Sequence, residues 1–85
     1  MQNAARLSDA INHGGSVTSG SGDVFINNIS AARVGDSVNC SQHGGSSIAA
    51  GSGSVTINGA PAARLGDPAG CGATISSGSG DVLIG

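Results

Sequence analysis

All the basic residues of this 85-residue chain are three arginines, and they occupy equivalent positions in an internal repeat. Each arginine follows two alanines and precedes an aspartate by three residues; the pairs are Arg6 and Asp9, Arg33 and Asp36, and Arg64 and Asp67. A Gly-Ser-Gly tripeptide and a short apolar run follow in every copy. Repeated copies bury a shared core only by packing on one another, so this pattern constrains the fold most. We expect one domain over residues 1–85, with copies at about 3–29, 30–60 and 61–85.

The apolar runs are short and rich in β-branched residues, which predicts strands. The runs after the tripeptides are Val24-Phe25-Ile26, Val55-Thr56-Ile57 and Val82-Leu83-Ile84, and those before them are Val17-Thr18, Ile48-Ala49 and Thr74-Ile75. Because glycine supplies the positive φ of tight turns, we interpret each Gly-Ser-Gly as a hairpin turn. Alternation with period two predicts that Val and Ile face the core, and that Phe25, Thr56 and Leu83 do not.

The order of the segments predicts that the three copies close into a ring. The last hairpin ends at Ile84-Gly85 with no arginine segment after it, whereas the chain begins with such a segment before Arg6. Three arginine segments and three hairpins therefore fit around a pseudo-three-fold axis. The alternative, an open stack, leaves unpaired strand edges at both ends. The expected fold class is a small all-β domain of three hairpin repeats.

Composition excludes several classes of protein. The chain has 16 Gly and one aromatic residue, 9% charged residues and a net charge of -2. Disordered linkers combine low hydrophobicity with high net charge, but 38% of these residues are hydrophobic. Without a basic stripe or stacking aromatics, nucleic acid is not an expected partner. The sequence has no apolar run long enough to span a bilayer and no signal-peptide pattern, so we expect synthesis in the cytoplasm without classical secretion.

Metal-ligand residues follow the same repeat. The residue seven positions after each arginine is His13, Cys40 or Cys71, and only the second copy carries four extra residues before its tripeptide, with His43 among them. Three-fold symmetry supplies three ligands, and the insertion supplies the fourth that a tetrahedral ion needs. The resulting Cys2His2 set predicts one structural zinc ion, in preference to iron.

A disulfide is the alternative role for the two cysteines. A bridge between Cys40 and Cys71 would staple a small domain and leave two unrelated surface histidines. No signal peptide indicates an oxidising compartment, and a disulfide does not explain why His13 occupies the cysteine position of its copy. The repeat register therefore favours zinc.

Enzymatic activity is not expected. Catalytic zinc keeps an open position beside a general base, whereas four ligands fill this sphere and the chain has no Glu. The repeated aspartates are predicted to cap turns or pair with their arginines at the surface, where each contributes about 0 to 1 kcal/mol.

These residues also resemble a known family. Pro61-Ala62-Ala63-Arg64 spells the motif of the PAAR-repeat proteins, and Ser30-Ala31-Ala32-Arg33 and Asn3-Ala4-Ala5-Arg6 are variants of it. The resemblance covers essentially the whole chain. It implies a small conical all-β protein, closed around one metal ion, at the tip of a trimeric spike in type VI secretion systems, contractile phage tails and related injection machines. Family members commonly bind zinc near the apex through three His and one Cys, so a second Cys here replaces a His.

The resemblance further implies a partner and a location. The partner is a trimeric spike protein of the valine-glycine repeat or phage hub-spike type, with one chain per trimer and a contact that includes Phe25, Thr56 and Leu83. Effector proteins carried non-covalently and transient contact with a target membrane belong to the same role. The chain would be assembled on the spike of a virion or secretion apparatus and delivered outside or into a target cell. The alternative function is a free zinc-stapled β adaptor with a different partner.

Overall fold

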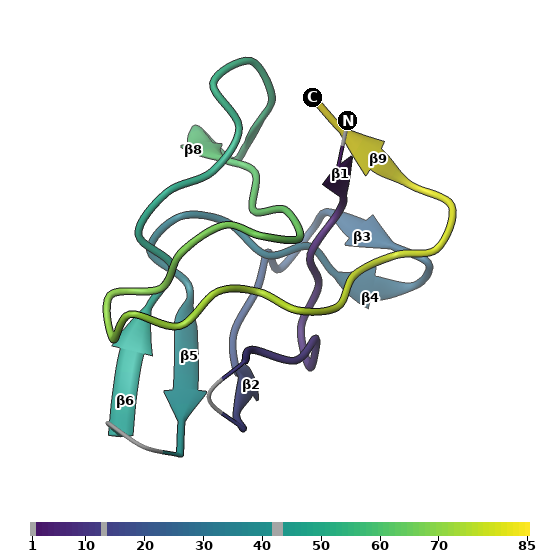
Figure 1. The fold of residues 1–85 in the computed structure, drawn as a ribbon. Coiled ribbons are helices and arrows are strands. Elements are labelled where there is room, and N and C mark those ends of the chain that lie inside the picture. Colours follow the sequence, from purple (N-terminus) through teal and green to yellow (C-terminus); the bar gives the residue numbers. More distant parts are fainter. Residues whose placement is uncertain (1, 13, 42–43) are drawn as a thin grey trace.

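The computed structural model describes residues 2–12, 14–41 and 44–85, and within these ranges the regular structure consists of short strands without a helix (Figure 1). The strands are β1 (Gln2–Asn3), β2 (Ser16–Val17), β3 (Phe25–Ile26), β4 (Ile29–Ser30), β5 (Ser37–Cys40), β6 (Gly44–Ser47), β7 (Thr56–Ile57), β8 (Ala60–Pro61) and β9 (Leu83–Ile84). No helix in this part of the chain is long and apolar enough to cross a membrane. The prediction of an all-β fold is confirmed.

Two hairpins turn at residue pairs that begin with asparagine, so the predicted placement of the hairpin turns at the Gly-Ser-Gly tripeptides was wrong. β3 pairs with β4, and β7 pairs with β8. Their loops are Asn27-Asn28, with φ of 54° and 64°, and Asn58-Gly59, with φ of 52° and 81°. Two consecutive positive φ values give the type I′ turn, whose twist matches that of the flanking strands. Asparagine tolerates this conformation better than other non-glycine residues, which explains why it occupies both turns.

In the third copy, the equivalent strand pair is formed by the two ends of the chain instead of by a hairpin. β1 pairs with β9 through Gln2 with Ile84 and Asn3 with Leu83, and Figure 1 shows the two termini side by side. Near the centre of the molecule, a cycle of three backbone hydrogen bonds links the copies: Ala5 donates to Ala63 (3.0 Å), Ala63 to Ala32 (3.0 Å) and Ala32 to Ala5 (3.1 Å). The closed pseudo-three-fold arrangement is confirmed, and the open stack was wrong.

The Gly-Ser-Gly tripeptides join copies closely instead of turning the chain. The Ser21 hydroxyl is buried and accepts the N–H groups of Asp23 (3.2 Å) and Val24 (2.9 Å); Ser52 and Ser79 do the same in their copies. A Cβ on Gly51 would lie 2.5 Å from the Ala62 carbonyl oxygen. The first glycine of the tripeptide is therefore needed for close backbone approach.

The core consists of two layers that repeat around the axis. One layer contains one isoleucine and one alanine from each copy: Ile26, Ile57, Ile84, Ala4, Ala31 and Ala62. The other contains the second alanine of each pair with further aliphatic residues and Cys40: Ala5, Ala32, Ala63, Ile11, Val38, Ala69, Val17, Ile48, Ile75, Ala73 and Cys40.

The predicted alternation along the second strands is largely confirmed. Phe25 (56% exposed) and Leu83 (50%) point away from the core, as does Thr56. Val24 and Val82 pack against the isoleucine layer. Val55, at 38% exposed, departs from the expected burial.

Candidate metal centre and partner surface

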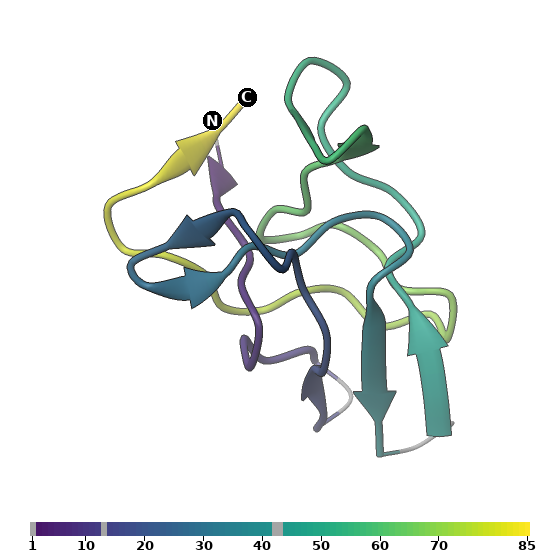
Figure 2. The same ribbon diagram turned by 180° about the vertical axis from the view of Figure 1, so that it is seen from behind.

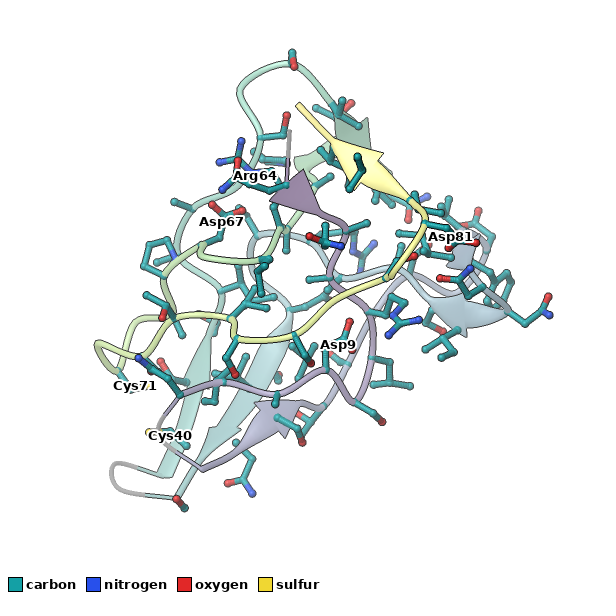
Figure 3. All side chains as sticks on the ribbon, turned by 45° about the vertical axis from the view of Figure 1, so that its right-hand side comes forward. Asp9, Cys40, Arg64, Asp67, Cys71 and Asp81 are labelled. Carbon is teal, nitrogen blue, oxygen red and sulfur yellow. The ribbon has the colours of Figure 1, made fainter. Side chains whose placement is uncertain are left out.

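The two cysteines lie next to each other at one end of the molecule (Figure 3). Cys40 ends β5 and is fully buried, whereas Cys71 lies in a turn and is partly exposed. The backbone N–H of Ala73 lowers the pKa of the Cys71 thiol, and hydrogen bonds with Cys40 and Ser46 lower it further. No disulfide joins the two sulfurs. Adjacent sulfur atoms, one of them with a stabilised thiolate, suit a soft metal such as zinc.

The two predicted histidine ligands, His13 and His43, lie outside the described residues, but the segments beside residue 13 are placed. Asn12 donates its N–H to the Thr74 carbonyl (2.9 Å) and accepts the Thr74 N–H on its side chain (3.0 Å). On the other side of residue 13, a Cβ on Gly15 would overlap the Asn39 carbonyl oxygen. Residues on both sides of position 13 in the first copy therefore contact residues close to Cys71 and Cys40. The three-fold register predicts that the metal ligands of the three copies meet there.

The second copy, which carries the four-residue insertion, extends at the same end into the hairpin β5–β6, paired from Ser37 with Ser47 to Cys40 with Gly44. This hairpin joins β2 in a three-stranded sheet ordered β2-β5-β6. Among the described residues, no group of three or more His, Cys, Asp or Glu is gathered as a metal site. The two described members of the predicted set fit a zinc ion, and the full set stays a prediction.

Each repeated aspartate both closes a turn and pairs with its arginine, as predicted. In the first copy, Asp9 Oδ1 lies 3.0 Å from Arg6 Nη2, and Asp9 Oδ2 accepts the Arg6 Nε (3.0 Å) and backbone N–H (2.7 Å). The other copies repeat this geometry within 0.1 Å. The aspartates are only 4 to 7% exposed. The expected surface location of these aspartates was therefore wrong, because each carboxylate is buried and accepts charge-assisted hydrogen bonds from its arginine.

Asparagine side chains connect neighbouring copies, which the sequence analysis missed. Asn58 Oδ1 accepts Arg33 Nη1 (3.0 Å), while Asn58 Nδ2 donates to Asp23 (2.9 Å). Asn27 links Arg6 to Asp81 in the same way. We call these two contacts the Asn–Asp seams.

The equivalent contact between the second and third copies has neither Asn nor Asp at these positions. Gly85 follows Ile84 as Asn58 follows Ile57, and its carbonyl oxygen accepts Arg64 Nη1 (3.0 Å) and the Ser52 hydroxyl (2.7 Å). Ser54 stands where the other copies have Asp. Asn and Asp are thus absent together, which is the sequence signal that could have revealed the seams.

The seams predict a loss of stability in acid. Hydrogen bonds from Asn58 and then Ser21 lower the pKa of Asp23, and those from Asn27 and then Ser79 lower the pKa of Asp81. Because these carboxylates bind protons less readily when folded, their stabilisation is present above the ordinary pKa of about 3.9 and is lost as the pH falls below it. We expect the Tm advantage of wild type over Asp23→Asn at neutral pH to shrink between about pH 4 and pH 2. Thermal denaturation of both proteins at matched pH values measures this difference in Tm. A Tm difference that stays the same from neutral pH to pH 2 would contradict the prediction.

Strands β3 and β9, which carry two exposed apolar residues, lie away from the end of the β5–β6 hairpin at which Cys40 ends β5 (Figures 1 and 2). Phe25 on β3, Thr56 on β7 and Leu83 on β9 hold the equivalent position of the three copies. We call these three residues the base positions. No pocket is found in the described part of the chain.

Comparison with known proteins gives one family. A family model described as the PAAR motif matches residues 7–77, which is most of the chain. A search of curated proteins found no match to this chain.

Proposed function

Since the chain belongs to the PAAR-motif family, we propose that it caps the tip of a trimeric spike in a contractile injection system, with a structural and not a catalytic role. The observation that carries the proposal is the closed pseudo-three-fold ring. One chain thereby presents three similar surfaces around one axis. A homotrimer ends in three identical surfaces, so a single chain of this symmetry covers its end.

The base positions form the proposed contact with the trimer. β3, β7 and β9 each pair with one other strand in the described sheets, which leaves a second edge for strands of the partner. Phe25 and Leu83 add apolar area, while the three arginines are held by their aspartates. The contact should therefore depend on shape and apolar burial more than on charge.

A zinc ion held by His13, Cys40, His43 and Cys71 completes the proposal at the opposite end. When bound, it would cross-link the three copies where the chain consists of short turns and a two-stranded extension. The adjacency of Cys40 and Cys71 and the placement of Asn12 and Gly15 support this assignment.

The test is to mix the protein with a trimeric spike tip from the same genome and to measure the mass of the complex and its affinity at low and high salt. We expect one chain per trimer and a Kd that changes little with salt. Phe25→Asp and Leu83→Asp should each weaken binding by about tenfold or more, with metal content unchanged. The matched control is Asn39→Asp, which adds a charge to an exposed residue of β5 at the other end.

Two outcomes would contradict the capping role. Three chains per trimer would show that symmetry is not matched within one chain. Loss of the complex at moderate salt would indicate charge-dependent binding and favour a free adaptor with a different partner.

A further inference from the structure

Cys40 and Cys71 belong to different copies and are brought together only by the fold. Cys40 lies opposite Gly44 in the β5–β6 hairpin, and Cys71 lies in a turn closed by the bond from the Ala69 N–H to the Ala73 carbonyl (2.8 Å). This turn packs on β6, since a Cβ on Gly70 would lie 2.9 Å from the Ser46 hydroxyl. Cys71 packs against the core cluster that contains Cys40, and Figure 3 shows the two side chains as neighbours.

The two sulfurs differ in access to solvent. Cys40 is completely buried, whereas Cys71 is partly exposed and accepts hydrogen bonds from Ala73 and Ser46. A small oxidant therefore meets Cys71 first, and Cys40 lies behind it as a second thiol. An exposed reactive cysteine with a resolving cysteine beside it is the arrangement found in redox-sensitive pairs.

We propose that Cys40 and Cys71 form a redox switch, in which a peroxide converts the metal-free pair to an intramolecular disulfide. The Cys71 sulfur attacks a peroxide oxygen and breaks the O–O bond, giving a sulfenic acid and releasing water or an alcohol. The Cys40 sulfur then attacks the Cys71 sulfur, the S–O bond breaks and water leaves. The two thiols lose two electrons and two protons, and the peroxide is reduced.

The disulfide step goes beyond the spike-tip role and does not depend on it, whereas the slower reaction of the metal-loaded protein rests on the proposed zinc site. A metal ion bound to both sulfurs occupies the electron pairs that would attack the peroxide, so the metal-loaded protein should react more slowly. The disulfide would join the second and third copies at the end that the metal otherwise holds. One pair of residues thus staples the domain under reducing conditions through the metal and under oxidising conditions through a covalent bond.

The test treats the wild-type protein with hydrogen peroxide, both as purified under reducing conditions and after chelation. We expect the chelated protein to lose two hydrogens by intact mass, and the metal-loaded protein to react about tenfold more slowly. Trypsin cuts this chain only after its three arginines, so Cys40 lies in peptide 34–64 and Cys71 in peptide 65–85. A non-reducing digest should contain these two peptides joined.

Matched variants test the order of reaction. In Cys40→Ser, a sulfenic acid should persist at Cys71 and be trapped by a dimedone probe, whereas in Cys71→Ser the buried Cys40 should label about tenfold more slowly. In denaturing urea the two variants should label alike, because the difference in burial is then lost. Equal labelling of the folded variants, a disulfide between two chains, or no loss of hydrogens from the wild type would overturn the proposal.

Discussion

Removing the proposed zinc ion with a chelator should lower the Tm of this domain by about 20 °C or more. Among the residues that the structure describes, the largest fully buried side chains are no bigger than isoleucine, so the aliphatic core alone stabilises little. A metal that joins all three copies contributes its binding free energy to folding. A loss of about 4 kcal/mol corresponds to roughly 20 °C for a domain of this size. Thermal denaturation with and without chelator, combined with elemental analysis, measures the effect.

His43→Ala is the variant that separates the predicted site from a simple three-fold site. His43 lies in the insertion and outside the repeat register, so three symmetric ligands alone would not require it. We expect this variant to bind the metal more weakly and to melt at a lower temperature. Protein purified under reducing conditions that contains no metal, with a Tm unaffected by chelation, would contradict the assignment.

Ile57→Asp should unfold most of the protein, whereas the neighbouring Thr56→Asp should not. Ile57 belongs to the three-fold isoleucine layer and is 7% exposed, while Thr56 points to solvent from the same strand. An unpaired carboxylate in the layer costs about 4 kcal/mol, close to the whole stability expected of a small domain. The surface charge at position 56 should change stability by about 0.5 kcal/mol or less.

Urea denaturation of both variants measures the difference, and it also prepares the partner experiment. Thr56→Asp should stay folded yet weaken capping, because position 56 is one of the base positions. Equal destabilisation by the two substitutions would show that the strand does not present alternate faces to core and solvent.

The repeat made much of this fold predictable. The copies, the all-β class and the buried isoleucines follow from spacing and alternation, which are local properties of the sequence. Ring closure also followed, since the chain begins with the segment that its last copy lacks. The seven-residue offset from each arginine marks Cys40 and Cys71, which lie next to each other in the structure; the four-ligand set stays a prediction, because its two histidines lie outside the described residues.

Contacts between copies were decided only by the tertiary structure. Gly-Ser-Gly and Asn-Asn are both turn signals, and local sequence does not say which of them closes a hairpin. The fold decides, because the strand before each tripeptide pairs with another copy: β2 pairs with β5, and Ile11 forms a bridge with Ile75.

The sequence by itself thus determined the repeating unit, the strand after each tripeptide and the closure of the ring, whereas the predicted strands at Ile48-Ala49 and Thr74-Ile75 form only isolated bridges. The tertiary structure decided the hairpin turns, the need for glycine beside the Ala62 carbonyl, the burial of the aspartates and the Asn–Asp seams. The physical reason is that periodicity records which face of a strand avoids water. Periodicity does not indicate which backbone or side-chain group of another copy comes within hydrogen-bonding distance.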